Sequence, residues 1–335
     1  MRRVAVLKSY GRFLRLNFFR GRLLSCLVSA VFATALFAAT PVPSSSLEST
    51  SKTPVLTSIG ISVSDLGNPY FVKLIDATAA KAKELAGGPV KMLIHSDAYD
   101  LDRQIKQVNE FIKAGVDLII LTAADPYKIA PVVAKAQRAG IKVIAVDVNA
   151  QGADATITTD NVQAGMEACE RLAKQIHYKG NFVIINGVLV SSVVERVAGC
   201  KSVLSKYPNI SLLSYRMNGS GSVDGGMEVM TYLMEKYPHL DAVFAINDPT
   251  ALGALRAAQQ AGRKDFIIAS VDGAKFAEKM IHQDNQWVAT AVQRPKEMAD
   301  KAVEIGLALL EGRPVPQRFI QIPSVLVEKP LPKTQ

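Results

Sequence analysis

Polar side chains with hydrogen-bonding groups follow the predicted strands of this chain at the points where the strands end. The clearest examples are Asn68, Asp147, Asn247, Asp272 and Gln293. In open α/β sheets, ligands bind at the carboxyl ends of the strands, so these side chains are candidates for one ligand site. Any single Asn or Asp among them fits the alternative role of strand terminator or helix cap better. Their recurrence at most strand ends in both halves of the chain favours a shared polar cleft.

The chemistry of the set suits a neutral ligand with several hydroxyl groups, because each hydroxyl can both donate and accept a hydrogen bond. Two carboxylates can accept, one guanidinium can donate through its planar fork, and three amides can do both. These groups belong to Asp147 and Asp272, to Arg196, and to Asn68, Asn247 and Gln293. Hydrogen bonds to such charged groups contribute about 1.5 to 3 kcal/mol each. Binding of this kind uses neither a cofactor nor a metal, and we expect none.

Two aromatic residues stand beside the first polar residue. The apolar, alternating run 59–63 leads into a polar turn and then into Asn68, Pro69, Tyr70 and Phe71. Proline is favoured in the first turn of a helix, so we expect a helix to begin here. Such a helix start would direct Asn68, Tyr70 and Phe71 into the crevice, where the two rings would cover the C–H face of a sugar ring.

The elements that must position these residues alternate regularly along the chain. Short Val- and Ile-rich runs alternate with helical patterns, which is typical of parallel sheets covered by helices on both faces. We expect strands near residues 55–63, 90–95, 117–122, 142–147, 181–186, 210–215, 242–247, 266–271, 288–292 and 319–322. We expect helices to start near Phe71, Leu101 and Tyr127, and others to cover residues 192–206, 223–236, 249–261, 274–283 and 295–310.

The repetition of this rhythm predicts an α/β fold with two doubly wound parallel-sheet domains joined by a three-crossing hinge. We expect one lobe to contain residues 54–158 plus 294–322, and the other to contain residues 159–293 plus 323–335. The cleft between two such lobes is the expected ligand site.

The amino-terminal segment has the pattern of a secretion signal. Residues 1–40 contain seven basic residues, no acidic residue and an apolar run from 23 to 39. This predicts a signal peptide over 1–40 with an uncertain cut site, and a linker over 41–53. An uncleaved membrane anchor stays open as an alternative, because the run reaches the short end of a spanning helix. Removing the segment leaves 32 Lys and Arg against 30 Asp and Glu, so nothing indicates a nucleic-acid partner.

Two cysteines follow the predicted signal, and both lie in amphipathic helical patterns. We interpret Cys169 and Cys200 as buried, unpaired structural thiols. A disulfide between them stays open in an oxidising compartment, because a sequence cannot place their Cα atoms within bridging distance.

At these residues the chain resembles the periplasmic ribose-binding-protein family, the type I sugar receptors of ABC importers. The resemblance covers roughly residues 56–327 and is strongest at 64–71, 242–255, 271–273 and 289–293. It implies a periplasmic, monomeric receptor that closes over a monosaccharide or polyol and delivers it to an ABC permease in the inner membrane. It also implies ligand contacts by Asn68, Tyr70, Phe71, Asp147, Arg196, Asn247, Asp272 and Gln293, with Ser64 as a weaker candidate behind them.

Two positions depart from the ribose pattern of that family. Val148 stands where the pattern has an arginine after the aspartate, and no aromatic residue occurs around 219–222, where one would cover the second face of the sugar. We therefore expect a bulkier or differently substituted ligand than ribose.

Other classes of protein fit parts of this pattern less well. An enzyme is disfavoured, because the glycine-rich turn 219–225 is one residue off the dinucleotide fingerprint and no nucleophile elbow or phosphate loop occurs. A DNA-binding regulator on the same fold would need a helical module that residues 1–50 leave no room for. A receptor that presents a signalling molecule to a membrane sensor stays open beside transport.

Overall fold

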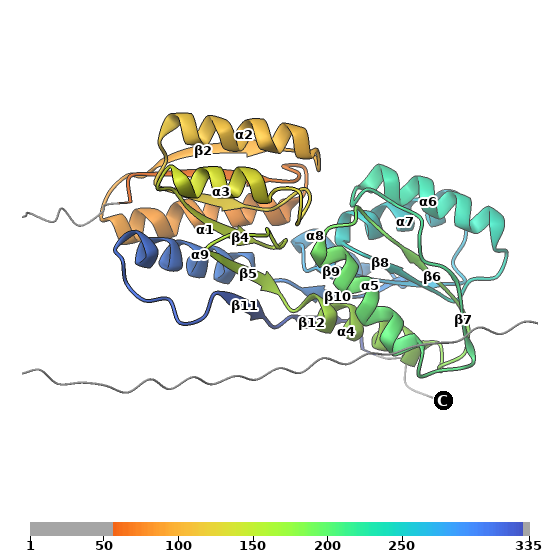
Figure 1. Ribbon diagram of the computed structural model, residues 1–335. Helices are drawn as coiled ribbons and strands as arrows, with labels where there is room; N and C mark the ends of the chain where they lie inside the picture. The colour runs from red at the N-terminus through yellow and green to blue at the C-terminus, as the bar shows by residue number, and fades with distance from the viewer. Residues whose placement is uncertain (1–55, 331–335) are drawn as a thin grey trace, which may run out of the picture. The chain divides into compact units, whose positions relative to one another are not determined.

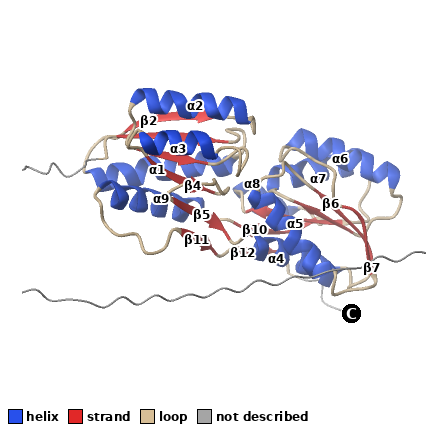
Figure 2. Ribbon diagram, viewed as in Figure 1, coloured by secondary structure: helices blue, strands red, loops and turns tan. Residues whose placement is uncertain are grey.

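The computed structural model describes residues 56–330. The predicted signal peptide and the whole of the predicted linker therefore lie outside the described residues. Within the described range, no helix is long and apolar enough to span a bilayer. The chain there forms two six-stranded sheets, each with helices on both faces (Figure 1, Figure 2). This confirms the predicted fold class.

The first sheet is entirely parallel and has the strand order β11-β5-β4-β3-β1-β2. Its strands are β1 (Ser58–Val63), β2 (Lys91–Ser96), β3 (Leu118–Leu121), β4 (Lys142–Val146), β5 (Ala155–Thr159) and β11 (Phe319–Ile322). Helices α1 (Pro69–Ala86) and α9 (Pro295–Leu310) cover one face, and α2 (Leu101–Ala114) and α3 (Ala130–Arg138) cover the other (Figure 1). Burial on both faces explains the continuous apolar runs of the central strands.

The second sheet has the order β12-β10-β9-β8-β6-β7 and is parallel except for β12, which pairs antiparallel with β10. Its strands are β6 (Gly180–Ile185), β7 (Ile210–Ser214), β8 (Ala242–Ala245), β9 (Ile267–Asp272), β10 (Trp287–Val292) and β12 (Val325–Glu328). Its helices are α4 (Asn161–Gln175), α5 (Ser191–Leu204), α6 (Val223–Lys236), α7 (Asp248–Gln260) and α8 (Lys275–Gln283). Helices α4 and α5 pack on the face opposite to α6 and α7.

The chain passes between the two sheets three times, from β5 into α4, from β10 into α9 and from β11 into β12. These passages contain Asp160, Arg294 and Pro323, where crossings were expected from the sequence. Because each passage is short, the carboxyl ends of strands from both sheets are brought near the same crossings. The division of the chain into two lobes stays a prediction.

Strands β5 and β12 were not expected from the sequence, and helix α4 was expected only as an amphipathic helical pattern around Cys169, without bounds. Strand β5 reads Ala-Thr-Ile-Thr-Thr and has Ile157 as its one strongly apolar residue. Helix α4 begins directly after it, capped by Asp160, whose side chain accepts from the N–H of Gln163. Strand β12 is a short antiparallel edge strand. The helix expected near Tyr127 begins at Ala130 instead, because the Asp125 carboxylate holds a turn by accepting from the N–H groups of Tyr127 and Lys128 at 3.0 and 2.9 Å.

The interpretation of the two cysteines as unpaired thiols is wrong. Cys169 of α4 and Cys200 of α5 form a disulfide, with their Cα atoms 5.2 Å apart. The helices can approach this closely because glycines lie at their crossing: a Cβ at Gly165 would be 2.0 Å from the carbonyl oxygen of Arg196, and one at Gly199 would be 2.2 Å from that of Val162. The backbones of α4 and α5 are therefore in direct contact.

Candidate functional site

A cavity lies at the carboxyl ends of strands from both sheets, and side chains from both sheets line it. All nine residues predicted from the sequence are among its lining residues. They are Ser64, Asn68, Tyr70, Phe71, Asp147, Arg196, Asn247, Asp272 and Gln293. The space among the side chains is narrow, with a cavity volume of about 30 Å³. The structure thus brings the predicted set together, in close mutual contact.

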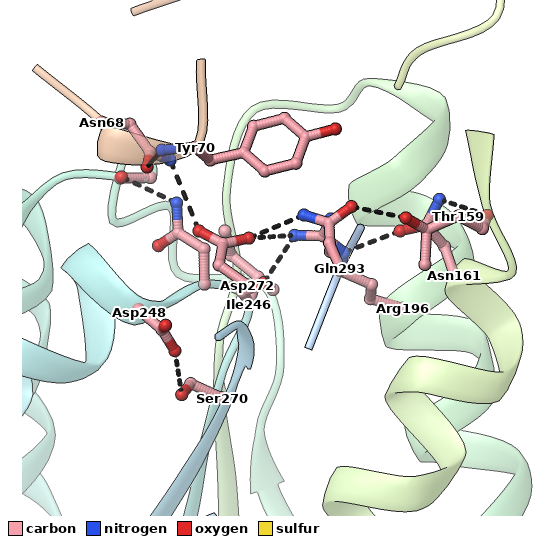
Figure 3. A network of polar contacts seen from close by, with 12 residues as sticks. Asn68, Tyr70, Thr159, Asn161, Arg196, Ile246, Asp248, Ser270, Asp272 and Gln293 are labelled. Atoms are coloured by element: carbon pink, nitrogen blue, oxygen red, sulfur yellow. Dashed lines mark hydrogen bonds and ion pairs between the residues drawn. The ribbon is translucent and has the colours of Figure 1, made fainter. Parts of the chain in front are cut away.

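Asn68 connects the two sheets across the cavity. Its side-chain oxygen accepts from the backbone N–H of Tyr70 at 3.0 Å and so caps α1, whose first residue is Pro69. The cap fixes the side chain, so its amide nitrogen points at Asp272 Oδ2, at a long hydrogen-bond distance of 3.4 Å (Figure 3). One asparagine therefore both starts a helix and reaches the other sheet.

Tyr70 and Phe71 form the expected aromatic side of the cavity, but much of each ring belongs to the core. Their ring centroids are 5.1 Å apart in an edge-to-face arrangement, and both side chains pack between the first sheet and helices α1 and α9. The Tyr70 hydroxyl donates to Asp147 Oδ1 at 3.2 Å. Burial, and next the Asp147 carboxylate, raises the pKa of the Tyr70 hydroxyl well above its ordinary value. Tyr70 is thus a hydrogen-bond donor at physiological pH.

Asp147 is the carboxylate with the most unused accepting capacity. Tyr70 is its hydrogen-bond donor among the described residues, and no described side chain donates to Oδ2. Its backbone has φ of +69°, a left-handed conformation that Asp and Asn tolerate better than most residues. Burial raises the pKa of its carboxyl to about 6, and the Arg196 guanidinium opposes that increase. Such an oxygen is well placed to accept from a ligand hydroxyl.

Asp272 is the centre of a hydrogen-bond network (Figure 3). Its Oδ1 accepts from Gln293 Nε2 at 2.8 Å and lies 3.6 Å from Arg196 Nη1. Burial raises the pKa of Asp272, and the same guanidinium acts against this. The ion pair is buried on both sides, with side-chain exposures of 5% for Arg196 and 4% for Asp272. Removing either partner would leave an uncompensated buried charge.

Arg196 is held by groups from three other elements. Its Nε donates to Asn161 Oδ1 at 2.9 Å, and its Nη1 donates to the carbonyl oxygen of Ile246 at 2.9 Å as well as facing Asp272. Its Nη2 has no hydrogen-bond acceptor among the described side chains and backbone. The protein thus engages the Nε and Nη1 groups of the guanidinium, and Nη2 remains to donate to a ligand.

Gln293 and Asn247 have most of their hydrogen-bonding groups engaged by the protein. Gln293 accepts from Thr159 Oγ1 at 2.7 Å while it donates to Asp272. Asn247 donates to the carbonyl oxygen of Gly221 at 2.9 Å and caps α7 by accepting from Thr250 N–H at 3.0 Å. Both side chains line the cavity, but their contacts indicate that they also hold neighbouring groups in place.

Ser64 was expected to lie behind the residues that contact the ligand, but it lines the cavity itself. Its hydroxyl oxygen is buried, lines the cavity and has no hydrogen-bond partner within the described chain. A buried polar group without a partner costs free energy. A ligand hydroxyl that bonds to Ser64 would remove this cost.

Tyr99 is a cavity residue that the sequence analysis missed. It lies in the loop after β2 with φ of +60°, held by a hydrogen bond from its N–H to Asp97 Oδ1 at 2.7 Å. Its hydroxyl lies 3.5 Å from the point that a Cβ at Gly221 would occupy. Burial raises the pKa of the Asp97 carboxyl, which accepts the hydrogen bond from the Tyr99 N–H, to about 7. Tyr99 therefore supplies an aromatic ring next to the segment where the second sheet lacks one. Its position three residues after the end of β2 was the available signal.

A second carboxyl group lies behind Asp272. Asp248 is fully buried and accepts from Ser270 Oγ at 2.6 Å, Thr290 Oγ1 at 2.7 Å and the N–H of Ala274 at 2.7 Å. Burial, and next the Asp272 carboxylate, raises the pKa of Asp248 to about 7. It does not line the cavity. Its contacts fix the strand ends that carry Asp272.

Aliphatic side chains complete the lining, and of these only Val148 was singled out from the sequence. Five of them, which we call the aliphatic wall, are Val148, Val188, Val190, Val193 and Ile246. No group of three or more metal-ligating side chains occurs in residues 56–330. The cavity thus combines a polar network, aromatic rings and an aliphatic surface.

Comparisons with known proteins agree with this architecture. The family model of the periplasmic binding protein domain matches residues 59–314. A ribose import binding protein of Bacillus subtilis is 30% identical over 268 residues, which cover 79% of this chain and 85% of the relative. A D-apiose import binding protein of Paraburkholderia graminis is 30% identical over 249 residues, covering 71% of this chain and 78% of the relative.

A solved structure gives the same result. The periplasmic binding protein component of the arabinose ABC transporter from Shewanella sp. ANA-3, bound to L-arabinofuranose, is 26% identical and superposes with a TM-score of 0.75, covering 81% of this chain and 92% of that chain. The family model spans most of the chain, and the curated relatives are matched over most of their length. The chain therefore belongs to the periplasmic binding protein family, as its resemblance to the type I sugar receptors of ABC importers predicted.

Proposed function

We propose that this protein is a solute receptor that closes over a monosaccharide or sugar-like polyol and delivers it to an ABC permease in the inner membrane. One observation carries the proposal: nine residues from separate strand ends and helix starts, chosen for their hydrogen-bonding chemistry, line a single cavity. Relatives named for the import of ribose and D-apiose support it. So does the family itself, which consists of solute-binding proteins and not of enzymes.

The charges of the cavity favour a neutral ligand. Two carboxylates, Asp147 and Asp272, face one guanidinium, Arg196, and burial raises the pKa of both acids. A ligand anion would meet this excess of negative charge, and a cation would compete with Arg196 for Asp272. Hydroxyl groups meet neither obstacle, because they can donate to Asp147 Oδ2 and accept from Arg196 Nη2.

Ligand entry requires the cavity to open. Direct contacts between the proposed lobes include Asn68 with Asp272 at 3.4 Å, across the cavity, and the N–H of Asn149 with Ser191 Oγ at 2.9 Å, outside it. We propose that the lobes 54–158 plus 294–322 and 159–293 plus 323–335 move as bodies about the three crossings. A ligand that bonds to both lobes would then stabilise the closed state by its differential contacts. We further propose that the receptor works as a monomer in the periplasm.

Isothermal titration against pentoses, hexoses, deoxysugars and polyols tests the proposal. We expect at least one of them to bind with a dissociation constant well below millimolar. If none does, the sugar-receptor function is wrong. The variant Ser64→Ala should weaken binding by about 1 kcal/mol, or about fivefold, because the ligand loses one hydrogen bond.

Ser64→Ala has a matched control in the same sheet. Thr122 also has a buried hydroxyl without a partner, but it does not line the cavity. Thr122→Val removes that hydroxyl at nearly constant shape and should leave affinity unchanged. Neither variant should lower the free energy of unfolding much, because neither removes a protein hydrogen bond. Equal affinity losses in both variants would contradict the proposed role of Ser64.

A further inference from the structure

The aliphatic wall is the aliphatic part of the cavity lining. Four of its members, Val148, Val190, Val193 and Ile246, are almost fully buried, with exposures between 1% and 7%. Ile246 Cδ1 and Val193 Cγ1 lie 3.0 and 3.6 Å from the same point, the Cβ position of Gly187. All four belong to one packed cluster, and Val188 packs against it.

The polar groups of the cavity are joined to one another and not to this surface. Asn68, Gln293 and Arg196 all contact Asp272, and Tyr70 contacts Asp147. Tyr70 and Phe71 pack in a different cluster from the wall. The carbonyl oxygen of Ile246 is already engaged by Arg196. A ligand in the cavity therefore meets hydrogen-bonding groups on one part of its surface and aliphatic carbon on another, where Ser192 is the neighbouring hydroxyl.

Val190 of the wall is the N-cap of α5 and makes no side-chain cap hydrogen bond. Ser, Thr, Asp and Asn are strongly preferred at such a position because they satisfy a free backbone N–H. Helices α3, α8 and α9 also begin without a side-chain cap, so the missing cap does not mark a ligand site by itself. Among these four helix starts in the described chain, α5 is the one whose N-cap residue lines the cavity, to which Val190 presents methyl groups.

We infer that the ligand is a deoxysugar, a monosaccharide in which a methyl group replaces a hydroxymethyl group and packs on the aliphatic wall. The inference rests on the proposed sugar-receptor function. A ligand hydroxyl placed against the methyl groups of the wall would find its nearest hydrogen-bonding side chains in Ser192 and Tyr99, and away from these two it would be buried without a partner, which is costly. A methyl group gains by leaving water anywhere on this surface. Val148 contributes to this surface, at the position where the ribose pattern has an arginine.

Matched sugar pairs test the inference by titration calorimetry on the purified receptor. The pairs are L-fucose with L-galactose, L-rhamnose with L-mannose, and 6-deoxy-D-glucose with D-glucose, each differing by one hydroxyl. We expect the deoxy member of the best-binding pair to bind at least about tenfold more tightly. If the hydroxylated member binds as tightly or more tightly, the inference is overturned and the sugar-receptor function stands. If no sugar of these pairs binds below millimolar, the inference is overturned, and the sugar-receptor function is overturned with it only if the pentoses and polyols of the wider panel also fail to bind.

Substitutions at two neighbouring valines test where the methyl group of the ligand packs. Val193→Thr places a hydroxyl on the wall at nearly constant shape and should reduce the preference for the deoxy sugar by at least about threefold. Val194→Thr is the matched control, because Val194 is the next residue of α5, is 49% exposed and does not line the cavity. It should leave the preference unchanged. A Val193→Thr protein that melts cooperatively like the control and keeps the full preference would overturn the assignment of the wall.

Discussion

The helix pair α1/α9 on the first sheet and the helix pair α4/α5 on the second position cavity residues in different ways. In the first pair, side chains separate the helices, and the packed residues include Leu74 of α1 and Met298 of α9. In the second pair, the backbones touch at Gly165 and Gly199, and a disulfide joins the helices. The first pair is an ordinary side-chain interface, whereas the second is a close crossing that tolerates no additional atom.

This difference follows from where each pair carries its cavity residues. Asn68 is placed by a local feature, the cap and first turn of α1. Arg196 lies in the second turn of α5, so its position depends on how α5 crosses α4. Its Nε is bonded to Asn161, the first residue of α4. The close crossing therefore fixes the one cationic group of the cavity, which a local cap could not do.

The largest expected effect comes from filling the crossing. Gly165→Leu places side-chain atoms where the Arg196 carbonyl oxygen lies, since even a Cβ would be 2.0 Å from it. Overpacking a rigid contact usually costs about 1 to 3 kcal/mol and occasionally more. Because the obstacle here is backbone, we expect a loss of more than about 4 kcal/mol in the free energy of unfolding, measured by urea denaturation.

The same substitution at Gly88 is the control. A Cβ there meets nothing within 4 Å, so Gly88→Leu should change stability by less than about 1 kcal/mol. Equal losses at the two positions would mean that the crossing is no more rigid than a surface turn.

The disulfide is expected to have the next largest effect. The double variant Cys169→Ala with Cys200→Ala releases a loop with a sequence separation of 31, for which loop entropy predicts a loss of about 3 to 4 kcal/mol. Urea denaturation of both proteins without a reductant, so that the wild-type disulfide stays intact, gives the value. Sugar affinity should change little, because the glycine contact still sets the crossing. A large loss of sugar affinity at unchanged stability would contradict this assignment. It would mean that the disulfide, and not the glycine contact, sets the crossing of α4 and α5.

Removing the cation that the crossing positions should affect binding directly. Arg196→Ala deletes contacts to Asn161, Ile246 and Asp272 and leaves a buried carboxylate without its counter-charge. Truncating one member of such a pair costs about 2 to 5 kcal/mol, so we expect sugar affinity to fall at least about thirtyfold in calorimetry. Arg256→Ala, on the exposed side of α7, is the control and should bind normally.

Most of the fold could be predicted because strands and helices have strong local patterns. The expected strands 142–147 and 288–292 match β4 and β10 within a residue, and the helix expected over 223–236 is α6. Strand β5 was missed because its threonines have little apolar character, so pairing with β4 and β11 decides its conformation. The disulfide was not predictable for a similar reason: the distance from Cys169 to Cys200 depends on two glycines at a crossing of helices.

The sequence predicted which residues line the cavity, but it could not predict which hydrogen bonds they make. Parallel strands end at one edge, so polar residues at those ends converge whatever the details, and all nine predicted residues line the cavity. Tyr99 was missed because a left-handed backbone turn directs it inward, which no periodicity reveals. The sequence also could not separate Asp147, which has free accepting capacity, from Asn247, whose amide is engaged by Gly221 and Thr250.

A pH dependence tests the first sheet's carboxylate, Asp147, which lies in the same cavity as the second sheet's cation, Arg196. Burial raises the pKa of Asp147 to about 6, against an unfolded value of 3.8. Between about pH 6 and pH 4 the folded state therefore binds the proton more tightly, so this group's contribution to folding stability increases as pH falls. Sugar binding should move in the opposite direction, because a protonated carboxyl accepts hydrogen bonds poorly: affinity should fall by up to tenfold per pH unit below about 6.

Asp147→Asn isolates this group from the other acids of the protein. Asparagine tolerates the left-handed backbone at this position, so the variant should fold. Both pH dependences, of affinity by calorimetry and of stability by thermal unfolding, should be flatter in the variant than in the wild type over pH 4 to 6. Asp76→Asn, on the exposed face of α1, should reproduce the wild-type curves. If Asp147→Asn leaves both curves unchanged, the titrating group lies elsewhere, and Asp147 is not the free acceptor that complements Arg196 across the cavity.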